Sequence, residues 1–150
     1  MCAAHITVDP LTQSVARNFS ELAVGDRCTE TIRITNDLVE AFIKMSGDSA
    51  PVHSDASLAR QMNYSGRVVH GLLVTLRFSR LLGMFVPGTM SVIHSIRFDY
   101  VRPVMIGDEL TYSVTIARLS AAAKLAVLDL AASRDGKICA KGVAQCVLIQ

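Results

Sequence analysis

The chain has 150 residues, of which 51% are hydrophobic and 19% are charged, and its formal net charge is +2. Such a composition is typical of a single globular domain and excludes an intrinsically disordered chain. Because the net charge is small and Lys and Arg are spread along the chain, we expect binding neither to nucleic acid nor to an anionic membrane.

Residues 1–18 have mixed polarity and contain Pro10, which favours a loosely ordered N-terminal lead-in. No internal repeat or linker divides the rest of the chain. We therefore expect one folded domain over residues 19–150.

The first regular elements of this domain are expected to be a strand and a helix. Thr and Ile are frequent in residues 28–35, which favours a strand. Thr35 then provides a helix cap, and apolar residues recur at helical spacing up to Gly47. Ser54 or Asp55 caps a further short helix that runs to about residue 62.

A longer apolar helix is expected from Gly71 to Gly83. Its sequence, GLLVTLRFSRLLG, is apolar on nearly all sides, so a single neighbouring element cannot bury it. The rest of the chain must therefore wrap around this helix.

Four strands are expected to provide this cover, at residues 91–100, 110–119, 124–133 and 137–149. Asp135 and Gly136 predict a tight hairpin between the last two strands, and such short links make neighbouring strands antiparallel. In the first strand, His94 shares a side with apolar residues, which predicts a buried histidine with a hydrogen-bond partner. A long helix wrapped by an antiparallel sheet defines an α+β fold.

Candidate catalytic groups are concentrated in residues 46–83. Asp48 and His53 stand five residues apart on a segment interrupted by Gly and Pro, where chains leave regular structure. Such a loop can turn a carboxylate and an imidazole toward one point. The helix start at Gly71 would present an unpaired backbone N–H to a developing negative charge. We therefore expect an acid–base pair and an oxyanion site here.

Three sequence features together carry a family resemblance. They are the segment SGDSAPVH at residues 46–53, which follows Phe42; the pair His70-Gly71 at the start of the apolar helix; and Arg102-Pro103-Val104 with the turn Gly107-Asp108 between strands. With these features the chain resembles the MaoC-like, (R)-specific enoyl-thioester hydratases, a family with the hot-dog fold. The resemblance covers most of the chain. It implies a single hot-dog domain in which an antiparallel sheet wraps around a long buried central helix.

The resemblance also implies an activity, namely (R)-specific hydration of trans-2-enoyl thioesters or the reverse dehydration of (R)-3-hydroxyacyl thioesters. Asp48 would take a proton from water, His53 would hold the same water and pass a proton onward, and the Gly71 N–H would polarise the thioester carbonyl. Ser79 would line the pocket that limits acyl length. His70 is expected to be structural, donating to a carbonyl of the Asp48 loop.

Two alternatives stay open at this point. One is an acyl thioesterase on the same fold, which would direct water at the carbonyl carbon; the pairing of Asp48 with His53 disfavours it. The other is a non-catalytic partner subunit of a heterodimeric dehydratase. The family pattern has Asn where this chain has Ala50, and an alanine side chain cannot hydrogen-bond to the loop, which keeps the second alternative open.

We expect no metal or redox cofactor, because the four cysteines and four histidines show no zinc-type spacing. By resemblance, the acyl group would be carried on CoA or on the phosphopantetheine of an acyl carrier protein, and the chain would form a homodimer. Free thiols suit a reducing compartment. The chain lacks a basic leader followed by an apolar core, and no apolar run approaches the roughly 20 residues that span a bilayer. We therefore expect a soluble, cytoplasmic protein.

Overall fold

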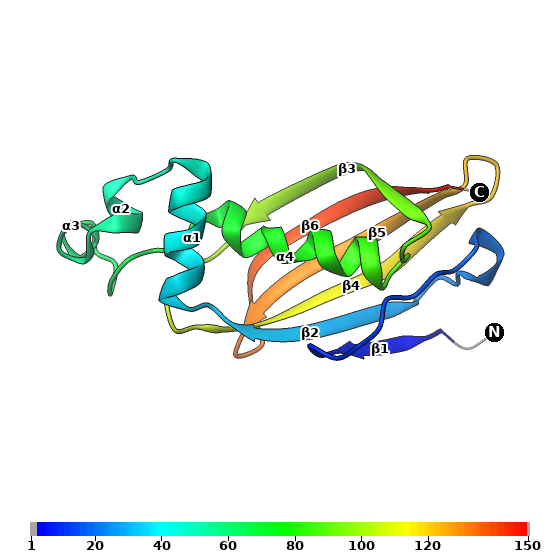
Figure 1. The fold of residues 1–150 in the computed structure, drawn as a ribbon, viewed down its shortest axis with the longest axis horizontal. Helices are drawn as coiled ribbons and strands as arrows, with labels where there is room; N and C mark the ends of the chain where they lie inside the picture. Colours follow the sequence, from blue (N-terminus) through cyan, green and yellow to red (C-terminus); the bar gives the residue numbers. More distant parts are fainter. Residues whose placement is uncertain (1–2, 150) are drawn as a thin grey trace.

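The computed structural model describes residues 3–149, in which a curled sheet holds a helix against its concave side (Figure 1). The elements in chain order are β1 His5–Val8, the 3-10 turn η1 Phe19–Glu21, β2 Arg27–Arg33, α1 Asn36–Ser46, α2 Pro51–Ser54, α3 Ala56–Gln61, α4 Gly71–Met84, β3 Ser91–Tyr100, β4 Glu109–Ser120, β5 Leu125–Arg134 and β6 Lys137–Leu148. The predicted α+β arrangement is confirmed.

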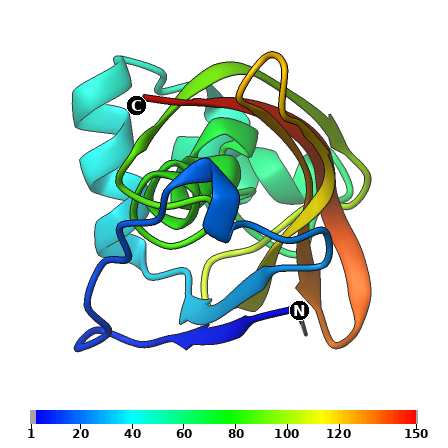
Figure 2. The same cartoon turned by 90° about the vertical axis from the view of Figure 1, so that its right-hand side faces the viewer.

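One six-stranded sheet has the order β1-β2-β4-β5-β6-β3. β1 is parallel to β2, and every other neighbouring pair is antiparallel. The predicted hairpin joins β5 to β6, with φ of 49° at Asp135 and 73° at Gly136, the positive values that a tight hairpin turn requires. The sheet curls around α4, while α1, α2 and α3 gather at one end of it (Figures 1 and 2).

The side of α4 that faces the sheet forms the centre of the hydrophobic core. Leu73, Val74, Phe78, Leu81 and Leu82 are buried there. The opposite side of the same helix is open, since Leu72 is 69% exposed and Leu76 is 52% exposed. The wrapping that an apolar helix calls for is therefore incomplete within one chain, because the sheet ends at β3 and does not close over this side.

A buried carboxylate joins α4 to β2. Glu30 of β2 is only 3% exposed, and Arg77 binds it with two hydrogen bonds of 2.6 and 2.7 Å. Arg80 adds a third, from Nη1 to Oε1 at 2.6 Å. The hydrogen bond with Glu30 raises the pKa of Arg77. The helix is thus fixed along the sheet by charge-assisted bonds as well as by packing.

The structure departs from the sequence-based expectations at two places. Part of the expected loose lead-in is regular structure: residues 5–8 form β1, which pairs with β2, and the buried Asp26 accepts hydrogen bonds from Ala4 N at 2.8 Å and from Arg17 Nη1 at 2.8 Å. His94 is exposed and not a core residue, because nearly all of β3, the last strand of the sheet, is exposed in the single chain. Neither the order of the N-terminal segment nor the exposure of His94 has a local sequence signal.

Among residues 3–149, no helix is long and apolar enough to cross a membrane. The cysteines at positions 28, 139 and 146 are buried and have free thiols. Burial raises the pKa of both the Cys28 and Cys146 thiols to about 12. These thiols belong to the core, where they pack as small apolar side chains.

Glu30→Gln should lower the free energy of unfolding by about 3 kcal/mol, near the low end for a broken buried ion pair because Arg77 and Arg80 both reach solvent. Urea unfolding measures this change. Glu109→Gln is the matched control, since Glu109 is exposed at the start of β4, and it should change stability by no more than about 0.5 kcal/mol. Equal effects of the two substitutions would contradict a structural role for the Glu30 cluster.

Candidate active site

The Asp48 carboxylate lies in the loop that follows α1. The helix ends at Gly47, whose φ of 76° is left-handed, a conformation that glycine adopts at helix ends. Asp48 Oδ1 accepts the N–H of Ala50 at 3.2 Å, and Ser46 Oγ accepts the N–H of Asp48 at 3.1 Å. The loop is therefore held partly by the carboxylate itself, and Oδ2 remains free to act on a substrate or a water.

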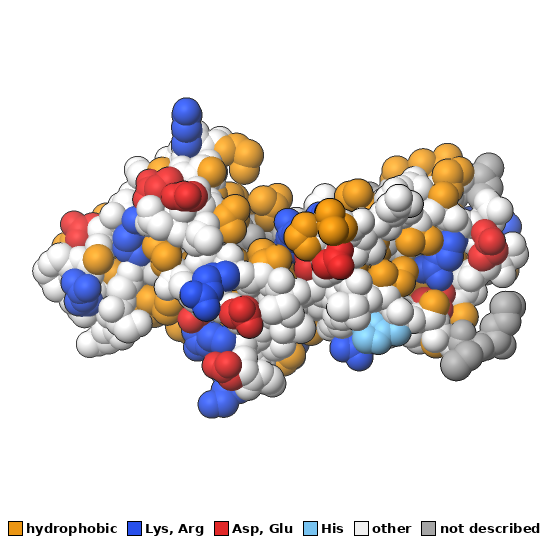
Figure 3. Space-filling model, turned by 60° about the horizontal axis from the view of Figure 1, so that its bottom comes forward, with side chains coloured by type: hydrophobic (Ala, Val, Ile, Leu, Met, Phe, Trp, Pro, Cys, Tyr) orange, Lys and Arg blue, Asp and Glu red, His pale blue; other side chains and the backbone are white. Residues whose placement is uncertain are grey.

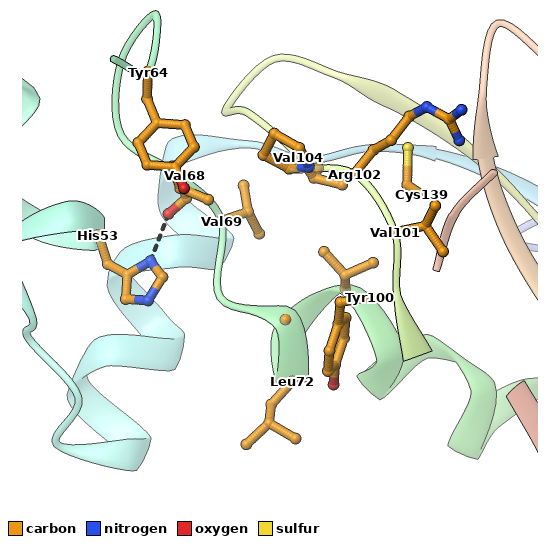
Figure 4. A pocket seen from close by; sticks show the side chains of 13 residues that line it. His53, Tyr64, Val68, Val69, Leu72, Tyr100, Val101, Arg102, Val104 and Cys139 are labelled. Carbon is orange, nitrogen blue, oxygen red and sulfur yellow. Dashed lines mark hydrogen bonds between the residues drawn. The ribbon is translucent and has the colours of Figure 1, made fainter. Parts of the chain in front are cut away.

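The His53 imidazole is presented by α2, a one-turn helix that begins at Pro51. Proline at the first helical position is favourable, because its missing N–H has no partner there. His53 Nδ1 lies 2.7 Å from the carbonyl oxygen of Val68 (Figure 4). A carbonyl only accepts, so Nδ1 carries the hydrogen and the neutral ring has its lone pair on Nε2. Nε2 is thus ready to accept a hydrogen bond or a proton.

His70 links these two groups. Its side chain is 3% exposed, and its Nε2 lies 2.9 Å from the backbone oxygen of Asp48 and 3.9 Å from Asp48 Oδ2. Its ring stacks on His53 with centroids 3.8 Å apart, and Phe42 packs at 4.8 Å. The expected hydrogen bond from His70 to a carbonyl of the Asp48 loop is therefore confirmed. The ring acts as a spacer that holds the loop against α2.

Gly71 is the first residue of α4, so its N–H has no acceptor within the helix. The ring of Tyr100 from β3 lies directly against it: a Cβ added at position 71 would fall 2.8 Å from Tyr100 Cε1. Tyr100 is itself fixed by a hydrogen bond of 3.2 Å between its hydroxyl and Thr75 Oγ1. Only glycine fits beside this ring without displacing it.

A pocket of about 500 Å³ opens beside His53 and Gly71, and Tyr64, Leu72, Tyr100 and Arg102 also line it. Figure 4 shows His53 and Tyr64 on one side of it and Arg102 and Cys139 on the other. The pocket is partly apolar and partly polar, which suits a ligand with both kinds of surface.

A second, more apolar groove of about 570 Å³ lies between α4 and β3, and Leu72 and Tyr100 line both hollows. Ser79, the residue expected to limit acyl length, lies in this groove with Phe42, Leu76 and Ile96. Ser79 is exposed and not buried inside the helix packing. The two hollows therefore meet at Leu72 and Tyr100, next to Gly71, and the groove extends away from them along α4.

One atom each of Asp48, His53 and His70 lies within 4.8 Å of the others, which raises the possibility of a metal site. The hydrogen-bond pattern argues against a three-ligand site, because His70 Nε2 donates to a carbonyl and the other ring nitrogen is buried without a partner among residues 3–149. Asp48 Oδ2 and His53 Nε2 remain as two acceptors. Two acceptors facing one space suit a water molecule, which has two hydrogens to donate.

Sequence reasoning proposed Asp48, His53 and Gly71 as site residues and did not anticipate the contacts that Val68 and Tyr100 make with His53 and Gly71. Val68 acts through its backbone oxygen, so its side chain carries no signal. Tyr100 meets Gly71 only because β3 packs beside α4. The one sequence signal for this contact was the glycine at the helix start, because glycine lets another group approach the backbone closely.

Comparisons with known proteins identify the family of the chain. Residues 22–128 match the family described as MaoC like domain. A mitochondrial 3-hydroxyacyl-[acyl-carrier-protein] dehydratase of Arabidopsis thaliana is 36% identical over 69% of this chain and 65% of its own length. An (R)-specific enoyl-CoA hydratase of Aeromonas caviae is 34% identical over 65% of this chain and 73% of its own length.

The match thus spans slightly less than two thirds of the plant relative. Among solved structures, the (R)-hydratase from A. caviae involved in PHA biosynthesis superposes with a TM-score of 0.82 at 30% identity, covering 85% of this chain and 98% of that one. The hot-dog fold expected from the sequence is therefore confirmed.

Gly71→Ala should cost about 1–3 kcal/mol of stability, because the added methyl displaces the Tyr100 ring. Gly83→Ala in the same helix is the matched control: nothing lies within 4 Å of a Cβ there, and alanine should stabilise the helix by up to about 1 kcal/mol. In a Tyr100→Ala background the cost of Gly71→Ala should vanish. Denaturant titration measures all four variants, and a cost that persists in that background rules out the Tyr100 contact as its cause.

Proposed function

The chain belongs to the family of MaoC-like domain proteins, and from this premise we propose that it hydrates trans-2-enoyl thioesters with (R) stereochemistry or dehydrates (R)-3-hydroxyacyl thioesters. The observation that carries the proposal is that Asp48 and His53 bring proton acceptors within 4.8 Å of each other, while His53 shares a pocket with Gly71, the first residue of α4. This reaction needs oxygen delivered to Cβ, a proton delivered to Cα and stabilisation of charge on the thioester oxygen.

The water is placed by the two acceptors. One hydrogen points to Asp48 Oδ2 and the other to His53 Nε2, which leaves an oxygen lone pair directed at Cβ of the substrate. Asp48 acts as the base that takes a proton as the C–O bond forms. The Asp48–His53 pair then returns one proton to Cα, so H and OH add across the double bond and the pair ends in its original charge state.

Charge on the substrate is stabilised at the start of α4. As water attacks Cβ, electrons move onto the thioester oxygen, and the Gly71 N–H donates to it. The helix N-terminus adds a favourable dipole at the same point.

The two hollows suggest how a substrate lies. The acyl chain would occupy the apolar groove that contains Ser79, and the carrier arm would leave through the pocket that contains Arg102. CoA and an acyl carrier protein present the same phosphopantetheine, so the structure favours neither. An assay with matched CoA and carrier-protein substrates distinguishes the two sources.

We also propose a homodimer, because a second copy of the chain would cover the edge of β3 and the open side of α4. β3 ends the sheet with an unpaired edge of ten residues, and such an edge pairs readily with another strand. Val92, Ile93 and Ile96 are exposed along it. A two-fold axis would pair β3 with its own copy and cover the open side of α4. Figure 3 brings the bottom of Figure 1 forward, away from β3, and shows hydrophobic side chains between charged ones on that face as well.

We propose the cytoplasm as the compartment of this protein. The support is the set of buried free thiols at positions 28, 139 and 146, since reduced cysteines are usual in reducing compartments. Fluorescence of a tagged full chain in its native cell tests this directly.

With crotonyl-CoA, the purified protein should remove the enoyl absorbance and form the (R)-3-hydroxy product. Asp48→Asn and His53→Ala should each lower kcat/KM by about 10²–10⁴-fold, the usual contribution of a proton-transfer group. Asp37→Asn and His5→Ala are the controls, since both residues are exposed and lie on other elements; they should keep the parent activity.

Other outcomes identify the alternatives. Release of free thiol from a saturated acyl thioester would indicate a thioesterase. A protein that is inert with both carriers, and active only after addition of a second hot-dog chain, would be the partner subunit of a heterodimer.

The chain should elute as a dimer in size-exclusion chromatography with light scattering. Ile96→Glu, on the exposed edge of β3, should shift it toward the monomer because two like charges would meet near the two-fold axis. Val24→Glu is the control, since Val24 is exposed far from β3 in the sequence and lies in the turn before β2. A parent protein that is monomeric at micromolar concentration contradicts this part of the proposal.

A further inference from the structure

His53 is held by two consecutive residues that precede α4. Val68 donates its N–H to the oxygen of Val52 at 3.0 Å and accepts the Nδ1 hydrogen of His53 at 2.7 Å. Arg67 donates from Nε to the backbone oxygen of His53 at 2.6 Å. One short segment therefore fixes both the ring and the backbone of this histidine.

The far end of the Arg67 side chain reaches α1. Its Nη1 lies 3.1 Å from Asn36 Oδ1, and its Nη2 lies 2.8 Å from Glu40 Oε1. The Glu40 side chain is 53% exposed, so attraction between the charges contributes little. The contact acts mainly by fixing the positions of its partners, because a guanidinium offers its donors in fixed directions.

These contacts join the two elements that carry the proton-transfer groups. Asp48 follows the last turn of α1, and His53 lies on α2. The loop between the two helices is exposed, and Ala50 within it has no polar side-chain atom to brace it. The contacts of Arg67 therefore add a bridge outside the loop, beside the contacts of His70 within the site.

We propose that Arg67 is a positioning residue for the Asp48–His53 pair: its three hydrogen bonds, to His53, Asn36 and Glu40, set the distance between the carboxylate and the imidazole. The proposal rests on the proposed function, because it concerns the same site. Arg67 touches neither the water nor the substrate. It acts by keeping α1 and α2 in register while both groups hold one water.

The first test is kinetic. Arg67→Met removes all three hydrogen bonds, and kcat for crotonyl-CoA should fall by about 10- to 100-fold, the effect of a misplaced catalytic group. KM should change by less than about twofold, because the acyl groove and the pocket are intact. Arg67→Lys should recover part of kcat, since an ammonium can still donate to the His53 oxygen but cannot span all three acceptors.

A double-mutant cycle separates positioning from general destabilisation. If Arg67 acts through His53, adding Arg67→Met to His53→Ala should lower kcat no further. Loss of folded protein would instead multiply the two effects. Arg60→Met is the matched control, because Arg60 is an exposed arginine on the neighbouring α3, and it should leave kcat unchanged.

A measurement that does not depend on turnover distinguishes failure of the Arg67 proposal from failure of the proposed function. In NMR spectra of the ¹⁵N-histidine protein, Arg67→Met should shift or broaden the ring signals of His53, and those of His5 should stay in place. An inert parent protein would refute the proposed function while this spectrum still tests Arg67. Unchanged His53 signals, an unchanged kcat, or multiplied effects in the cycle would each overturn the positioning role.

Discussion

The site depends on where α4 begins. The sheet needs an apolar helix against its concave side, and burial of the helix face that includes Phe78 and Leu81 fixes the axis of that helix. The Glu30 cluster then fixes its position along β2. Once axis and position are set, the amide of Gly71 has one location, and the candidate acid–base groups have to be positioned relative to it.

The other groups are brought there by contacts around His70. This residue caps α4 through its backbone, while its side chain holds the Asp48 loop and stacks on His53. A single buried imidazole therefore couples the helix start to both proton acceptors. Burial of a polar ring costs free energy. The hydrogen bond to the backbone oxygen of Asp48 and the stack on His53 offset part of that cost.

Local signals in the sequence were sufficient for most of the secondary structure. Thr35 and Gly47 bound α1, and Asp135-Gly136 forms the hairpin, because cap and turn chemistry act over a few residues. Contacts between distant segments could not be read in this way. The order of the N-terminal segment depends on the pairing of β1 with β2. The exposure of His94 depends on the position of β3 at the end of the sheet, and the placement of Tyr100 depends on the approach of β3 to α4. Residue types and spacing were enough to name candidate site residues, but not the contacts that hold them in place.

One face of α4 builds the core, and the other lines the groove. Core positions such as Leu73 and Phe78 face the sheet, whereas Leu72, Leu76 and Ser79 face the groove. A helix repeats every 3.6 residues, so each kind of position recurs without overlapping the other. Natural variation at the groove positions can therefore alter which molecules are accepted at small expense to the fold, and a single ancestral scaffold can diversify its ligands by changes on one face of one helix.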